Sequence, residues 1–186
     1  MSEVLTALGR SSSDPDAVLD TVVESARRLC RCAAAAIYLI EDDHFVLSSS
    51  VGLSGEFVSY IDAHPMKLDR RTLVGRVTQD RTMNQVPDVL RDPEYGRQDL
   101  QEIGRYRTLV SAPMLLDDEV VGALSLFRTE VDPFDDRAFA LLGAFAALLE
   151  GAHQVHVPHD HGGLSGERLE QRDLAIVERI DRAAHK

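Results

Sequence analysis

The sequence predicts a mixed α/β domain of the α+β type, built on an antiparallel sheet with one long helix before it and another after it. Two apolar runs, 109–116 and 120–127, flank an acidic turn at 117–119, and such a pattern predicts an antiparallel hairpin. A second pair of runs, 33–40 and 45–51, flanks another acidic turn and predicts a second hairpin. Apolar residues at helical spacing on both sides of these hairpins predict the two long helices.

The first helix is predicted to begin at Asp14-Pro15-Asp16 and to end near Cys30. An acidic capping residue followed by proline is typical of a helix start, because proline is tolerated where the backbone N–H would be unpaired. The apolar positions then recur with the helical period, at Val18, Leu19, Val22, Val23, Ala26 and Leu29. This stripe is expected to cover one face of the sheet.

Between the two hairpins the sequence predicts short elements joined by loops. Proline and glycine divide this segment into pieces too short for a long helix. The pieces are a helix over 52–63, a helix over 72–80, a short strand over 82–86, a loop over 88–95 and a short helix over 98–104.

The last hairpin carries two informative residues within its strands. Pro113 cannot donate to a ladder, so it is expected at a sheet edge or a bulge, and Gly122 marks a close approach of backbone or helix. Alternation puts Ser111 and Thr108 on opposite faces of the strand, so both reach one pocket only if the Pro113 region is bulged.

The C-terminal third changes in character along its length. A long apolar helix over 135–153 closes the predicted domain, which spans residues 1–152. Residues 153–165 carry histidine, proline and glycine and predict a linker. Residues 166–186 predict a charged helix whose thin apolar stripe would pack along a partner or lead into a further domain.

Composition limits the classes of function. The chain has 186 residues and a formal net charge of −11, which disfavours a general nucleic-acid or anionic-membrane binder. No run reaches the roughly 20 apolar residues of a membrane helix, and the first residues lack the pattern of a secretory signal. The two cysteines, Cys30 and Cys32, are typical of a reduced chain, so we expect a cytoplasmic protein.

The order of these parts resembles the GAF domain, over about residues 5–151. The residues that carry the resemblance are 18–32, 35–40, Val51-Gly52-Leu53, Leu73-Val74-Gly75-Arg76-Val77, 85–89, Asp92-Pro93, 107–114, Val121-Gly122-Ala123-Leu124 and Pro133-Phe134. The resemblance implies an antiparallel sheet of five to six strands. It also implies terminal helices on one face, and short helices and loops that roof a ligand pocket on the other.

The resemblance further implies a regulatory, small-molecule-sensing domain of a bacterial-type signalling protein, and not an enzyme. Ligand binding would be coupled to a homodimer formed through the N- and C-terminal helices, and to an output domain. The ligand is an unknown small molecule, no cofactor is indicated, and neither a nucleic acid nor a membrane is expected as a partner.

Seven residues are candidates for binding the ligand: Arg76, Asp88, Arg107, Thr108, Ser111, Tyr38 and Phe57. An arginine near hydroxyls and backbone N–H groups can hold a carboxylate or a phosphate. The alternative for Asp88 and Arg107 is that they cap loops and pair with each other.

Other functions stay open at this point. The domain could dimerise without binding any ligand, or it could be a redox enzyme of the free methionine sulfoxide reductase type. The latter needs pocket cysteines, and none follows Cys32. His153, His156, His159 and His161 could chelate a metal, although a proline- and glycine-bearing linker supplies little of the fixed geometry that ligands need. His64 is the one histidine in the roof region that could ligate haem.

Overall fold

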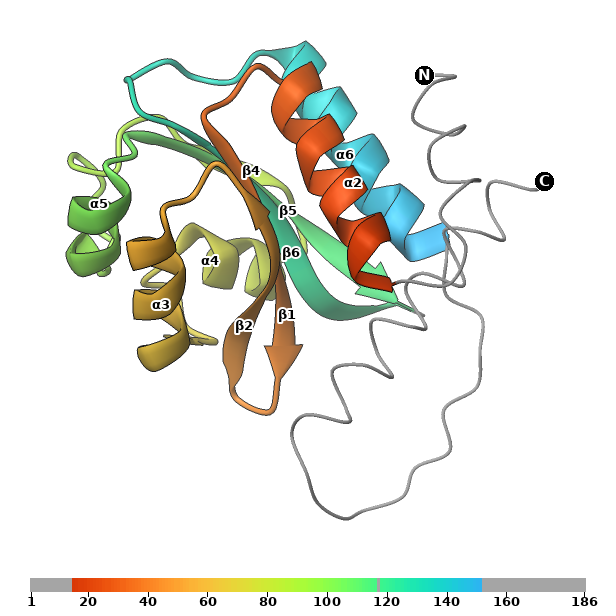
Figure 1. Ribbon diagram of the computed structural model, residues 1–186, viewed down its shortest axis with the longest axis horizontal. Coiled ribbons are helices and arrows are strands. Elements are labelled where there is room, and N and C mark those ends of the chain that lie inside the picture. The colour runs from red at the N-terminus through yellow and green to blue at the C-terminus, as the bar shows by residue number, and fades with distance from the viewer. Residues whose placement is uncertain (1–14, 117, 152–186) are drawn as a thin grey trace.

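The computed structural model describes residues 15–116 and 118–151 (Figure 1). A curled antiparallel sheet of six strands forms the middle layer, with two long helices on one face and three short helices on the other. This arrangement confirms the predicted fold class. Within the described ranges, no helix is long and apolar enough to cross a membrane.

The sheet has the strand order β3-β2-β1-β6-β5-β4, and each neighbouring pair is antiparallel. Its strands are β1 (Ala34–Glu41), β2 (His44–Val51), β3 (Met66–Lys67), β4 (Asn84–Val86), β5 (Thr108–Leu116) and β6 (Glu119–Arg128). Both predicted hairpins are present, as β1–β2 and β5–β6. Strand β3 was not predicted, because two residues carry no periodic signal and are defined only by their pairing with His44 and Phe45.

Helices α2 (Pro15–Leu29) and α6 (Asp136–Gly151) lie side by side on one face of the sheet (Figure 1). Their buried residues include Leu19, Val22 and Leu142, and these pack on the sheet residues that face them, such as Val110 and Leu124. The apolar stripe of the first helix therefore does cover the sheet, as its period predicts.

The opposite face of the sheet is covered by a roof, which we define as α3 (Gly55–Ala63), α4 (Leu73–Asp80), α5 (Gln98–Gly104) and the loop 87–97 (Figure 1). Helix α3 begins three residues later than predicted, because Ser54 caps it: its hydroxyl accepts the Phe57 N–H at 3.1 Å. Thr72 caps α4 in the same way, accepting the Gly75 N–H at 3.1 Å.

Pro113 and Gly122 lie where the sequence predicts special backbone. Strand β4 pairs only with residues 109–111 of β5, so Pro113 lies on a stretch of β5 that has a partner on one side only. A Cβ added to Gly122 would lie 2.2 Å from the backbone oxygen of Tyr38, which shows that β1 and β6 approach closely at this glycine. The predicted linker and C-terminal helix, residues 153–186, lie outside the described residues.

Candidate ligand-binding site

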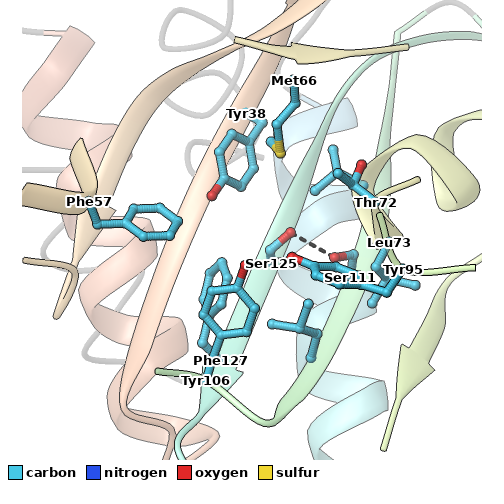
Figure 2. A pocket seen from close by; sticks show the side chains of 12 residues that line it. Tyr38, Phe57, Met66, Thr72, Leu73, Tyr95, Tyr106, Ser111, Ser125 and Phe127 are labelled. Carbon is cyan, nitrogen blue, oxygen red and sulfur yellow. Dashed lines mark hydrogen bonds between the residues drawn. The ribbon is translucent and has the colours of Figure 1, made fainter. Parts of the chain in front are cut away.

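An enclosed cavity lies between the sheet and the roof (Figure 2). Its volume is about 20 Å³, which is room for about one water molecule. The sheet contributes Tyr38, Met66, Leu109, Ser111, Ser125 and Phe127, and the remaining lining residues are Phe57, Thr72, Leu73, Val74, Tyr95 and Tyr106. We call this space the enclosed cavity.

Aromatic rings form much of the cavity wall. Tyr106, two residues before β5, lies at their centre, with ring centroids 6.2 Å from Phe57, 6.4 Å from Tyr95 and 5.3 Å from Phe127. Edge and tilted contacts of this kind stabilise aromatic pairs beyond the area that they bury. The cluster joins α3, the loop 87–97 and the sheet into one wall.

Hydroxyl groups supply the polar part of the wall. The Ser111 and Ser125 hydroxyls are hydrogen-bonded at 2.7 Å, and so are the Tyr95 and Tyr106 hydroxyls at 2.5 Å (Figure 2). The Tyr38 hydroxyl points into the space between Phe57 and Ser125 (Figure 2).

None of the residues that line the enclosed cavity is charged. Burial raises the pKa of Tyr95 to about 12 and raises the pKa values of Tyr38 and Tyr106 as well, because the low-dielectric surroundings disfavour a phenolate. All three phenols therefore stay protonated at neutral pH. The cavity offers hydrogen-bond donors and acceptors without any net charge.

The two serines meet because the last hairpin contains a bulge. The pairing of β5 and β6 shifts by one residue between Met114 and Leu115, and this shift places Ser111 directly opposite Ser125. Without it, continuation of the register from Leu116–Glu119 would place Ser111 opposite Leu124. The bulge therefore determines which polar groups line the cavity.

A second hollow is lined by residues of α4, β4 and the loop 87–97, and we call it the outer groove. It has a volume of about 640 Å³ and is open to solvent. It is lined by Arg76, Gln85, Val86, Pro87, Asp88, Arg91, Asp92, Pro93, Arg107 and Val131.

Two arginine–aspartate pairs line the outer groove. Arg107 donates from Nε and Nη2 to the two carboxylate oxygens of Asp88, at 2.9 and 2.8 Å. These hydrogen bonds lower the pKa of Asp88. Arg76 on α4 donates from Nη1 to Asp92 and thereby ties the helix to the loop 87–97.

The structure divides the seven candidate residues among different places. Tyr38, Phe57 and Ser111 line the enclosed cavity, whereas Arg76, Asp88 and Arg107 line the outer groove. The pairing of Asp88 with Arg107 is the alternative that the sequence left open.

Thr108 lines neither hollow, because its hydroxyl is engaged with the chain itself. Its Oγ1 lies 2.7 Å from Pro87 O and 2.9 Å from Glu130 O, and it accepts the Asp132 N–H at 3.0 Å. The bulge lies after both Thr108 and Ser111, so it does not bring them to the same face.

Sequence reasoning missed Ser125, Tyr95 and Tyr106 as lining residues. Ser125 could have been noticed as a single polar residue inside the apolar run of β6. The two tyrosines flank α5 in irregular segments, where no periodicity shows the direction of a side chain.

The two thiols lie on the far side of the sheet from the enclosed cavity. Cys30 and Cys32 are free and buried, and both belong to the core beneath α2 and α6. Burial raises the pKa of each thiol to about 11, so neither is a reactive thiolate at neutral pH. The residues that the structure describes contain no group of three or more His, Cys, Asp or Glu side chains that could hold a metal ion. The four linker histidines lie outside those residues.

Comparison with known proteins agrees with this architecture. A family model described as "GAF domain" matches residues 12–154, which is most of the chain. The chain belongs to the GAF domain family. Its fold matches the GAF domain of a phosphoenolpyruvate-protein phosphotransferase from Acinetobacter with a TM-score of 0.66 and 21% identity, over 81% of this chain and 87% of that one.

The chain also resembles proteins with other functions. The chain is 25% identical over 135 residues to the anaerobic nitric oxide reductase transcription regulator NorR of Vibrio vulnificus, covering 71% of this chain and 26% of the regulator. It therefore spans about a quarter of that relative. The free methionine-R-sulfoxide reductase of Neisseria meningitidis, solved in complex with its substrate, shares the fold with a TM-score of 0.64 and 16% identity, over 98% of this chain and 88% of that one.

Proposed function

We propose that this GAF domain is a regulatory sensor that binds a small, uncharged molecule in the enclosed cavity. The observation that carries the proposal is the uncharged, hydroxyl-lined space between the sheet and the roof. An ion would lose its hydration there and would find no opposite charge, which is costly in a low-dielectric site. A neutral acceptor in this space would receive a hydrogen bond from the Tyr38 hydroxyl, which points into it.

The cavity is small as it stands, so a ligand larger than water must displace part of the roof. The sheet is the rigid wall, because β1, β5 and β6 are paired along their lengths. Tyr95 lies in the irregular loop 87–97 and is the lining residue that moves at the least loss of secondary structure.

The sheet offers a direct route from the cavity to the terminal helices. Tyr38 faces the cavity, whereas its neighbours Ile37 and Leu39 belong to the core beneath α2 and α6. A ligand that shifts Tyr38 along β1 therefore changes the packing under both helices. Such a change in packing can shift the equilibrium between two conformations of a helix or domain attached to this one.

We propose that α6 dimerises with a second copy of the chain. Its outer side exposes Ala140, Ala144 and Ala147, and the helix carries no charged residue between Arg137 and Glu150. An exposed apolar helix side without charges is typical of a protein–protein contact. The relatives among regulators support the same sensory role for the domain.

We propose a non-enzymatic role in a reducing, cytoplasmic compartment. The free, buried thiols support this compartment. The similarity to free methionine-R-sulfoxide reductases supports only a common fold, and in this chain the cysteines lie across the sheet from the cavity with raised pKa values.

The second candidate function is a dimerisation module without a ligand. The small volume of the enclosed cavity favours it, because the roof already packs on the aromatic cluster. The two functions share the dimer and differ only in whether the cavity is ever occupied.

Native mass spectrometry of freshly purified chain tests both candidates. The sensor proposal expects a dimer with a non-covalent adduct that is lost in Tyr38→Phe and retained in Tyr60→Phe, a control whose hydroxyl does not line the cavity. A bare dimer supports the ligand-free module. A bare monomer contradicts both proposals.

A further inference from the structure

The outer groove contains an arginine whose hydrogen-bonding capacity is only partly used. Arg76 is 7% exposed, donates from Nε to the Arg70 carbonyl at 2.9 Å and donates from Nη1 to Asp92. Glu94 approaches the same Nε at 3.6 Å. Nη2 is buried and has no partner among the described residues. A buried guanidinium nitrogen without an acceptor lowers the stability of the fold, so one more oxygen atom near Nη2 would be stabilising.

Two further arginines line the same groove and also retain free donors. Arg107 uses Nε and Nη2 on Asp88, which leaves Nη1 without a hydrogen bond to the residues described. Arg91 is 87% exposed and only approaches Asp88, with its Nε 3.6 Å from the carboxylate. The groove is therefore lined by three guanidinium groups and two carboxylates, in a chain whose net charge is −11.

Apolar side chains complete the groove. Val86, Pro87 and Pro93 line it beside the charged groups, and so does Val131, which is 50% exposed. Its volume of about 640 Å³ lies within the range of small-molecule sites, roughly 300–1,000 Å³. An apolar wall next to free guanidinium donors suits a molecule with a short carbon body and an anionic head.

We propose that the outer groove binds a small organic anion, whose carboxylate or phosphate oxygens accept hydrogen bonds from Arg91 and Arg107 next to the partly unpaired guanidinium of Arg76. Guanidinium groups bind both kinds of oxyanion through paired, charge-assisted hydrogen bonds. This site is separate from the enclosed cavity, since the two hollows share no lining residue. The inference goes beyond the proposed sensor function and does not depend on it.

The test is a titration of the full, ¹⁵N-labelled chain, followed through the arginine Nε–Hε signals by NMR. Sodium succinate and sodium phosphate are the two probes, and sodium chloride keeps the ionic strength constant. Saturable shifts of the Arg76 and Arg107 signals are expected with at least one probe. A stronger response to succinate identifies a carboxylate ligand, and a stronger response to phosphate identifies a phosphate ligand.

Two variants separate a specific site from general charge attraction. Arg91→Gln removes an exposed side chain, so the fold is retained, and it should weaken binding at least about tenfold through the loss of charge-assisted hydrogen bonds. Arg28→Gln removes the same charge from an exposed position on α2 and should leave binding unchanged. Shifts no larger than those of the chloride control, or equal affinities of the two variants, overturn the proposal.

Discussion

Replacement of Thr108 by valine tests whether this residue holds the domain together rather than binding a ligand. The substitution keeps the shape of the side chain and removes the hydroxyl. In the folded chain that hydroxyl donates to Pro87 O or Glu130 O and accepts the Asp132 N–H. It thereby joins β5 to the loop that follows β4 and to the segment between β6 and α6.

The expected loss follows from these contacts. Two hydrogen bonds disappear at a fully buried side chain, and each contributes about 1 kcal/mol to stability. Thr108→Val should therefore lower the free energy of unfolding by about 2 kcal/mol, or the midpoint of thermal unfolding by about 6 °C in a domain of this size.

Urea and thermal unfolding, both followed by circular dichroism, measure this loss. Thr129→Val is the matched control, because Thr129 is exposed at the end of the same hairpin and should change stability by less than about 0.5 kcal/mol. If the two variants unfold alike, the Thr108 hydroxyl does not stabilise the fold and the structural role assigned to it is wrong.

Three further predictions concern packing, charge and thiol chemistry. Gly122→Ala should lower the free energy of unfolding by about 1–3 kcal/mol, because its Cβ would lie 2.2 Å from a backbone oxygen of β1. Gly55→Ala is the control, because the added Cβ meets open space. An equal loss of stability in both variants, measured by urea unfolding, would contradict this view. Arg107 lowers the pKa of Asp88 in the folded chain, so the carboxylate adds stability above its unfolded pKa of about 4 that is lost as the pH falls through the folded pKa. The acid-induced fall in unfolding free energy below about pH 5 should therefore be smaller in Arg107→Gln, and an unchanged fall would argue against the ion pair. Both cysteines should react with Ellman's reagent at pH 8 much more slowly in the native than in the unfolded chain. The reason is that pKa values of about 11 leave only about one thiol in a thousand ionised at this pH. Rapid labelling of the native chain would refute the burial of the thiols.

The sequence predicted the elements of the fold well because they carry strong local signals. Apolar periodicity located α2 and α6, and acidic turns between apolar runs located the two hairpins. Pro113 and Gly122 were correctly interpreted as an edge position and a close approach, since each reports a backbone constraint that does not depend on distant parts of the chain.

The candidate site was predictable only in part. Alternation along β5 correctly separated Thr108 from Ser111, because a strand of known direction has only two faces. It could not show that Arg76, Asp88 and Arg107 line the outer groove and not the enclosed cavity, since helix α4 and the loop 87–97 have no fixed relation to the sheet until they pack.

By itself, the sequence determined the fold class, the two hairpins and the two long helices, because period and turn chemistry are local properties of the chain. Only the tertiary structure decided which side chains line the enclosed cavity. The one-residue shift between Met114 and Leu115 brings Ser125 to Ser111, and the packing of irregular segments brings Tyr95 to Tyr106. Both meetings depend on the exact register of a hairpin or on the packing of a loop, and the apolar period of the sequence encodes neither.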